Sequence, residues 1–335
     1  MNMRVSVAAA AAVVVATALA ASPAEATFPG RNGVLVFQRP VRKQVDLFTV
    51  APPGGSAHRL TNSGTWEEKA EWSPDGTRLA FGRSAPSGDP TEIASMSAGG
   101  GDLRILTHLA SSSQAPTWSP DGRIAYFSLF GAPRPASRDV PPPAELYSMT
   151  VDGSDQRRLT DDKQIQTDPE WSPDATTIAY SQWYTVPGQP GVFDIGLSLM
   201  NRDGTNRRAL LGDSAHRDIA TQSWSPDGKK LVVEWISARP HGRTGGRQSD
   251  IAVINADGTG LRFLTRTPAL ETEPVWSPDG TMIAFASDRH AKRGRHLDRN
   301  GSALEIYTMQ SDGGHVRRIT HNHVADLYPD WQPLP

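Results

Sequence analysis

The sequence contains no cysteine, and after its first 26 residues it has no apolar run long enough to span a bilayer. No disulfide can form, so the stability of the protein must come from a packed core. Neither sign of charge predominates, because the chain has 34 Lys and Arg residues and 36 Asp and Glu residues. No nucleic-acid partner is therefore expected. There is no G-x-S-x-G nucleophile elbow and no Walker or dinucleotide-type glycine pattern. What is plentiful is 30 Gly and 27 Pro residues among recurring apolar strands, which favours a turn-rich β protein.

Residues 1–26 have the parts of an export signal. Arg4 provides a positive start, the run VSVAAAAAVVVATALAA is apolar, and AEA at residues 24–26 matches the small-x-small cleavage pattern. The alternative is a membrane anchor that is retained. We expect cleavage near Ala26 and a secreted or extracytoplasmic protein (periplasmic or extracellular) made of residues 27–335.

One five-residue motif recurs along the chain. WSPDG begins at Trp72, Trp118, Trp224 and Trp276, and the near copy WSPDA begins at Trp171. Pro sets the first corner of a tight turn, Asp tolerates the second, and Gly takes the left-handed position. Ala175 replaces that glycine in one copy, at a cost of roughly 1 kcal/mol. The motif therefore predicts a turn, with a tryptophan before it that can wedge between neighbouring sheets.

The strands around these turns are evenly spaced. Three strands are expected after each motif. The second and the third of them end eleven residues apart in all five repeats. From the end of the third strand to the next tryptophan is eleven residues in four repeats and thirteen in one. Four short strands per repeat predict an all-β, six-bladed β-propeller. Five blades should begin near Trp72, Trp118, Trp171, Trp224 and Trp276. The sixth should consist of residues 33–61 and the C-terminal strand at 328–333, which pairs with the N-terminal strands.

These motifs support a family resemblance. P-x-W-S-P-D-G followed by I-A-F, I-Y-x-M, D-G and L-T resembles the TolB-type (WD40-like, PD40) propeller repeat, from Gly33 to Pro333. The resemblance implies the propeller fold and several roles: the Tol–Pal envelope system, gates on serine peptidases, and metal-dependent lyases of pectin fragments. TolB carries an α/β domain before its propeller, whereas here the repeats follow the signal directly, so a Tol–Pal role is not expected.

The strand order predicts which segments share a face. The tryptophan turns should lie on a lower face, together with the Asp-Gly turns at Asp152, Asp203, Asp257 and Asp312 that follow the second strand of four repeats. The segments of variable length between the first and second strands, and the connectors that lead into each tryptophan, should lie on an upper face, where binding loops are expected. Acidic residues in these connectors should ring the upper mouth of the central channel. They either accept backbone N–H bonds at strand starts or bind a cation or a cationic peptide. The acidic residues are Glu67, Glu68, Asp168, Glu271, Glu273 and Asp326.

Three long upper segments are basic, at 131–145, 237–250 and 287–305, and the last includes Arg289, Arg293 and Arg295. They are either solvated loops or an electropositive rim for an anionic partner. Trp66, Trp183 and Trp235 lie outside the repeat, and either pack under the loops or stack on a sugar or peptide. The nine histidines show no helical metal-ligand spacing, so we assign no metal ligand and no cofactor, and leave a divalent cation open.

These features predict a secreted, non-catalytic binding or scaffold protein that uses its upper face to engage a protein, a peptide or a cell-envelope glycan. The alternative is a metal-dependent lyase or hydrolase acting on an anionic saccharide at the channel mouth. We expect a monomer that is not an integral membrane protein.

Overall fold

Strands make up all of the regular structure in the computed structural model, which describes residues 30–87, 90–108, 111–129, 142–162, 164–186, 193–211, 217–237, 248–290 and 304–335. The expected signal peptide at residues 1–26 lies outside these ranges, as do Arg293 and Arg295. Within these ranges, no helix has the length and apolar character needed to cross a membrane.

The described strands follow the repeat of the sequence. Those of the N-terminal quarter are β1 (Arg31–Val41), β2 (Gln44–Val50), β3 (His58–Arg59), β4 (Trp66–Trp72), β5 (Arg78–Ser84), β6 (Glu92–Ser97) and β7 (Arg104–Ile105). The next two repeats contain β8 (Ser113–Trp118), β9 (Arg123–Ser128), β10 (Glu145–Thr150), β11 (Arg157–Arg158), β12 (Ile165–Trp171), β13 (Thr177–Thr185), β14 (Phe193–Asn201) and β15 (Arg208–Leu211). The last part contains β16 (Arg217–Trp224), β17 (Lys230–Ser237), β18 (Gln248–Asn255), β19 (Arg262–Phe263), β20 (Glu271–Trp276), β21 (Met282–Ser287), β22 (Glu305–Gln310), β23 (Arg317–Arg318) and β24 (Leu327–Leu334).

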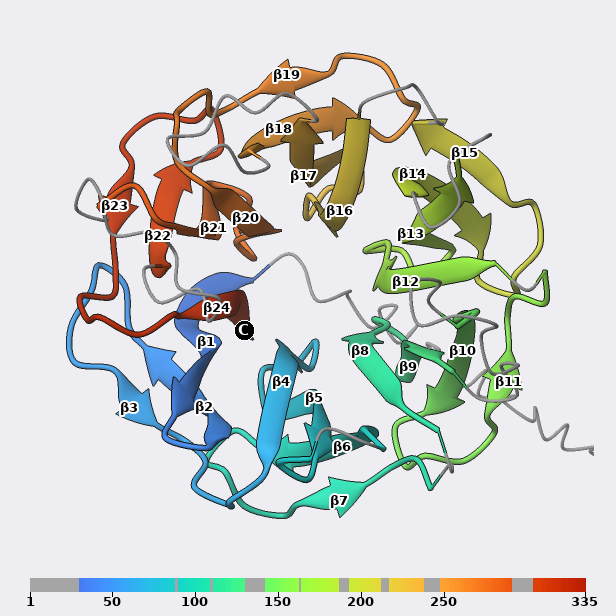
Figure 1. The fold of residues 1–335 in the computed structure, drawn as a ribbon, viewed down its shortest axis with the longest axis horizontal. Coiled ribbons are helices and arrows are strands. Elements are labelled where there is room, and N and C mark those ends of the chain that lie inside the picture. Colours follow the sequence, from blue (N-terminus) through green and yellow to red (C-terminus); the bar gives the residue numbers. More distant parts are fainter. Residues whose placement is uncertain are drawn as a thin grey trace, which may run out of the picture.

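The sheets stand around a central axis, with β4, β8, β12, β16, β20 and β24 innermost (Figure 1). Four sheets have four strands each, beginning with β8, β12, β16 and β20, and a fifth has eight strands. The fold is thus an all-β propeller. It differs from the expectation of six separate sheets, because one parallel pair, Val45 with Trp66, joins β2 to β4 and merges two groups of four strands.

The two ends of the described chain lie in one sheet. Strand β24 pairs antiparallel with β1, with Leu35 opposite Trp331 and Arg31 opposite Leu334. The predicted pairing of the C-terminal strand with residues 33–37 is confirmed. The backbone there packs tightly against the next turn, since a Cβ on Gly76 would lie 2.1 Å from the Pro333 carbonyl oxygen.

The repeated motif forms the predicted turn through its aspartate. Asp75 Oδ1 accepts hydrogen bonds from the Ser73 hydroxyl at 2.6 Å and from the Thr77 backbone N–H at 3.0 Å. Partial burial would raise the pKa of Asp75, but these hydrogen bonds lower it overall. The glycine position is left-handed, with φ 65° at Gly76 and φ 58° at Ala175. The alanine copy therefore adopts the same backbone conformation as the glycines, which is strained for a residue that carries a Cβ atom.

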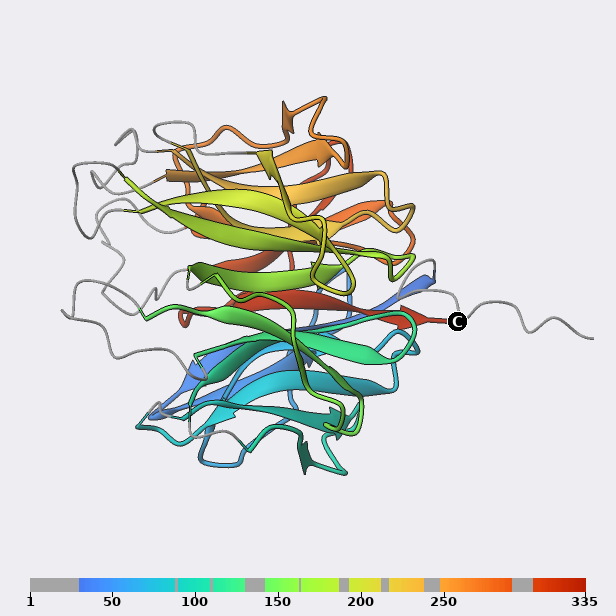
Figure 2. The ribbon, with the colours of Figure 1, turned by 90° about the vertical axis from the view of Figure 1, so that its right-hand side faces the viewer.

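The motif tryptophans pack between neighbouring sheets. Trp331 holds the corresponding position in β24 and is counted with them. All six are between 1 and 4% exposed, and Trp118 Nε1 donates to the Glu71 carbonyl oxygen of the preceding inner strand at 3.1 Å. Turns of both kinds lie at one face, because the N–H groups of Arg202 and Ala256, directly before the Asp-Gly turns, donate to the carbonyl oxygens of Thr176 and Lys229 in tryptophan turns. Figure 2 shows the C-terminus emerging at one face of the disc, next to the Gly76 turn, and we call that face the lower face.

Candidate functional site

Each inner strand carries a β-bulge just before its tryptophan. The register shifts between the fourth and the first residue before Trp72, Trp118, Trp171 and Trp276, and between the fifth and the second residue before Trp224. The third residue before the tryptophan is left-handed in five inner strands, with φ between 49° and 55° at Lys69, Ala115, Asp168, Glu273 and Tyr328. A bulge adds one residue to a strand and turns the side chains that precede it to the other face. It therefore decides which side chains reach the channel.

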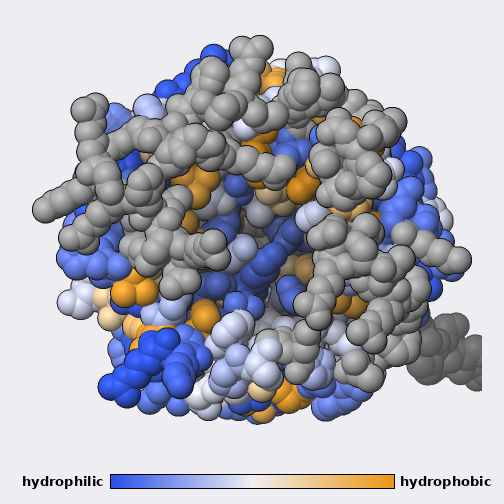
Figure 3. Space-filling view, viewed as in Figure 1, coloured by the Kyte–Doolittle hydropathy of each residue, from blue (hydrophilic) through white to orange (hydrophobic). Residues whose placement is uncertain are grey.

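Among the described residues, two cavities lie one above the other along the channel. The upper chamber has a volume of about 240 Å³, and its lining includes Trp183, Glu234 and Thr272. The lower cavity has a volume of about 120 Å³ and reaches down to the residues that directly precede the tryptophans. Figure 3 shows the hollow at the centre of the upper face, with hydrophilic residues inside it. Five residues line both cavities and so form the narrow passage between them: Lys69, Asp168, Thr221, Glu273 and Tyr328.

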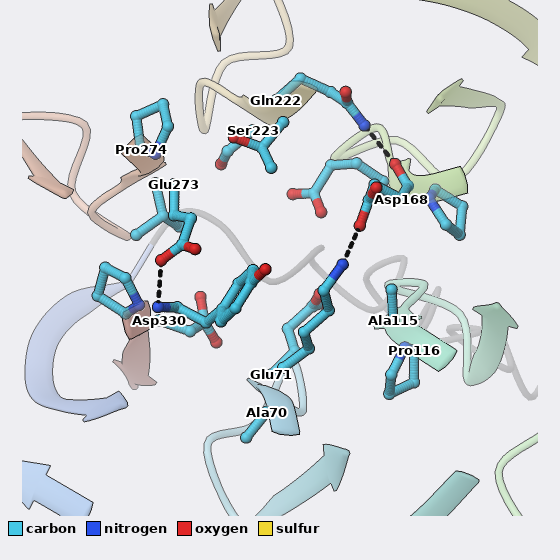
Figure 4. Close-up of a pocket in the computed structure, with 17 residues that line it drawn as sticks. Ala70, Glu71, Ala115, Pro116, Asp168, Gln222, Ser223, Glu273, Pro274 and Asp330 are labelled. Atoms are coloured by element: carbon cyan, nitrogen blue, oxygen red, sulfur yellow. Dashed lines mark hydrogen bonds and ion pairs between the residues drawn. The ribbon is translucent and has the colours of Figure 1, made fainter. Parts of the chain in front are cut away.

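Lys69 occupies the middle of this passage. Its Nζ lies 2.6 Å from Asp168 Oδ1 on β12, two sheets further round the ring (Figure 4). The same ammonium group lies 5.1 Å from the ring centroid of Tyr328. Burial alone would lower the pKa of Lys69, but Asp168, Tyr328 and Glu273 raise it overall. Lys69 is therefore a fixed positive charge held by an acid and an aromatic face.

Two glutamates lie beside this pair. Glu273 Oε2 accepts a hydrogen bond from the Tyr328 backbone N–H, and Figure 4 shows its carboxylate turned into the channel. Burial raises the pKa of Glu273 to about 8, and neighbouring Glu234 adds to this effect. Glu234 itself is buried and accepts hydrogen bonds from the hydroxyls of Thr272 and Thr221. The upper chamber thus carries more acidic than basic groups.

Three further acids, Glu71, Glu170 and Asp330, lie in the lower cavity directly before a motif tryptophan. Two of them tie one sheet to the next: Glu71 Oε1 accepts from the Trp118 N–H at 2.8 Å and Asp330 Oδ2 from the Trp72 N–H at 2.7 Å. Burial raises the pKa of Asp330 to about 7 and raises those of Glu71 and Glu170 well above their usual range. Mutual repulsion contributes to the shifts of the two glutamates.

The acids predicted for the channel mouth have three different positions. Asp168 and Glu273 line the channel, and each is itself the left-handed residue of its bulge. The placement was wrong for Glu67, Glu271 and Asp326, which lie on the other side of the bulge and are at most 2% exposed. Their carboxylates are hydrogen-bonded, to Thr61 for Glu67, Thr267 for Glu271 and Arg39 for Asp326. Glu68 is half-buried, burial raises its pKa, and it is not among the lining residues of either cavity.

The non-repeat tryptophans also differ. Trp183 lines the upper chamber, where its Nε1 donates to the Thr167 hydroxyl at 3.3 Å. Trp235 is 9% exposed and packs edge-on against Phe263, so it belongs to the core. Trp66 is half-buried and donates from Nε1 to the Lys43 carbonyl oxygen.

The remaining predicted residues concern the basic rim and the histidines. Arg289 is paired with the buried Glu271 and lies 5.1 Å from the Tyr307 ring centroid, so its charge is already neutralised. His290 bonds through Nδ1 to the Tyr307 hydroxyl. In the part of the chain that the structure describes, no three His, Asp or Glu side chains are arranged to hold a metal ion.

Sequence reasoning missed Lys69, Tyr328, Glu234, Glu71, Glu170 and Asp330. For the last three a signal existed, because each directly precedes a motif tryptophan. For Lys69 and Tyr328 there was none, since the third position before the six tryptophans holds six different residue types: Lys69, Ala115, Asp168, Thr221, Glu273 and Tyr328.

Comparison with known proteins identifies the family. The model of the TolB β-propeller domain (PD40) matches residues 143–333, more than half of the chain. The chain belongs to the TolB β-propeller family. A TolB homolog of Chlorobium luteolum is 30% identical over 145 residues, which are 43% of this chain and 29% of that protein. The chain thus spans less than a third of the length of the curated TolB relatives it matches.

Solved structures extend the TolB-like fold over nearly the whole chain. TolB from Acinetobacter baumannii is similar with a TM-score of 0.67 and 19% identity, over 91% of this chain and 68% of that one. Hydrazine synthase of Kuenenia stuttgartiensis is similar with a TM-score of 0.72 and 15% identity, over 93% of this chain and 49% of that one. At these identities the likeness shows the fold alone.

Proposed function

We propose that this chain is an extracytoplasmic, non-catalytic binding protein that engages a protein, a peptide or a cell-envelope glycan through its upper face. The observation that carries the proposal is the upper chamber, a polar hollow in which acidic and aromatic side chains are held on strands of the propeller. Sites on rigid elements keep their geometry without paying much ordering entropy on binding. The TolB relationship supports a binding role, and a peptide fits the narrow chamber better than a branched glycan.

The same proposal covers the architecture and the location of the protein. We propose six blades, with the eight-stranded sheet forming two blades that touch at the single pair Val45 with Trp66. The propeller domain comprises residues 27–335, and residues 1–26 are a signal peptide removed near Ala26. We further propose a monomer that needs no cofactor and binds no nucleic acid.

Affinity capture with matched variants tests the binding face. The protein is immobilised, incubated with envelope extract, and the captured partner is identified and titrated directly. Trp183→Ala, in the upper chamber, should weaken the partner's affinity at least fivefold. Lys229→Ala, whose exposed side chain lies in a lower-face turn, should leave it unchanged. Equal affinities for the two variants, with melting temperatures intact, would reject the upper face as the binding site.

Elemental analysis of protein purified without chelators provides the second measurement. A binding protein should retain its partner after treatment with a chelator. Stoichiometric Mn, Zn or Ca whose removal abolishes activity on uronate oligomers would replace this proposal with the metal-dependent lyase.

A further inference from the structure

Lys69 spans the channel because the intervening inner strand leaves room for it. The position that corresponds to Lys69 on β8, between β4 and β12, is Ala115, whose methyl group is among the lining of the lower cavity. Lys69 can therefore reach Asp168 past this strand. The ammonium group stands in the passage between the cavities and forms part of the floor of the upper chamber.

The charges around the upper chamber do not balance. Asp168, Glu273 and Glu234 line it, whereas Lys69 is the one basic residue among its described lining. Asp168 already holds the ammonium group at 2.6 Å, so Glu273 and Glu234 face the chamber with only hydroxyl and backbone N–H donors. Burial disfavours the ionised form of both carboxyls and so raises their pKa, and a second cation entering the chamber would stabilise that ionised form.

Two aromatic rings add a preference for organic cations. Tyr328 already presents its ring to the Lys69 ammonium, with 5.1 Å between them. Trp183 lines the same chamber, half-buried, with its indole fixed by Thr167 and by a tilted contact with Phe193 at 5.9 Å. A planar guanidinium can stack on an indole and bond a carboxylate through two N–H groups, which an ammonium cannot do.

The size of the chamber limits the ligand to one side chain. Its volume of about 240 Å³ is below the roughly 300–1,000 Å³ of pockets that enclose a whole small ligand. A group carried by a larger partner, with its backbone outside on the upper face, fits this space.

We propose that the upper chamber receives the guanidinium of an arginine side chain from the binding partner, which pairs with Glu273 and Glu234 and competes with Lys69 for Asp168. This inference rests on the proposed function in taking the partner to be a protein or peptide. Lys69 then acts as an internal competitor: it holds the empty site together and lowers the affinity for the incoming cation.

Calorimetric titration with two small probes tests the inference. N-acetyl-arginine amide carries the guanidinium, and N-acetyl-citrulline amide has nearly the same shape without its charge. At pH 8.5, where Glu273 is ionised, the arginine probe should bind saturably, and the citrulline probe at least tenfold more weakly. Glu273→Gln should weaken the arginine probe at least tenfold.

The Lys69 variants give the distinguishing result. Lys69→Met should tighten binding of the arginine probe at least fivefold, a gain that a merely structural lysine would not produce. Lys69→Arg, which keeps the competing charge, should bind like the wild type. If Lys69→Met does not fold, Lys69→Gln removes the charge while keeping a donor for Asp168 and should also tighten binding. Equal binding of both probes, or weaker binding by the folded neutral variants, would overturn the inference.

The outcome is separable from that of the proposed function. Partner capture that depends on Trp183, together with no binding of the arginine probe, leaves the binding protein and rejects the arginine chamber. Selective probe binding without any partner at the upper face rejects the proposed function and keeps the cation site.

Discussion

Replacing Asp330 by asparagine should make the protein more stable at alkaline pH. Asp330 lies in the lower cavity, where burial raises the pKa of its carboxyl to about 7 from 3.8. Its Oδ2 accepts a hydrogen bond from the Trp72 N–H. An asparagine side-chain oxygen can accept the same bond, so the substitution removes the ionisation and keeps the tie between the sheets.

The size and sign of the effect follow from proton binding. Between about pH 4 and 7 the unfolded chain has released the proton of Asp330, whereas the folded protein still holds it. The folded state binds more protons, so the free energy of unfolding falls as pH rises through this window. A shift of about three pH units corresponds to roughly 4 kcal/mol, at about 1.4 kcal/mol per unit. Asp330→Asn should therefore match the wild type near pH 4 and exceed it by up to about 4 kcal/mol above pH 8.

Urea denaturation from pH 4 to 9, with linear extrapolation to water, measures this difference. Asp152→Asn is a control of opposite sign: hydrogen bonds from Thr150 and Ser154 lower the pKa of Asp152 to about 2. That variant should be less stable than the wild type above about pH 4, and the gap should close as pH falls through 2. A difference for Asp330→Asn that stays constant with pH, or a variant less stable at pH 9, would refute the assignment of a buried, protonated carboxyl.

Two further substitutions test the ring closure and the turns. Trp331→Ala removes a side chain that is 3% exposed in the sheet formed by both chain ends, and should cost about 3–5 kcal/mol of unfolding free energy. Trp66→Ala, at a half-buried position, should cost clearly less in the same denaturation experiment; equal losses would contradict the deeper burial of Trp331 in this sheet. Ala175→Gly removes the strain of an alanine in the left-handed conformation and should raise the free energy of unfolding by up to about 1 kcal/mol. An unchanged melting temperature in calorimetry would show that the turn is unstrained.

The architecture was predictable because it rests on a repeated turn with a strict residue requirement. The Pro-Asp-Gly sequence fixes backbone angles, and constant eleven-residue spacings leave few ways to arrange the strands. The same spacing led to the correct partner for the C-terminal strand, at Leu35 and Trp331. The merger of two strand groups through Val45 and Trp66 was missed, because one backbone pair leaves no trace in the sequence.

The channel was predictable only in part, because its lining depends on the bulges. Alternation along a regular strand would put the fifth, third and first residues before a tryptophan on one face. The bulge breaks this alternation, so Glu67 and Asp326 point into the protein, whereas Asp168 and Glu273 point into the channel. Lys69 was missed because its partner is 99 residues away, a contact that only the closed ring creates.

The union of β1 and β24 also has a bearing on how the protein is made. A polypeptide made N-terminus first exposes one edge of β1 until β24 has been made. Until then, that edge is open to pairing with strands of other chains. The pairing of β24 with β1 therefore removes an edge at which two molecules could associate.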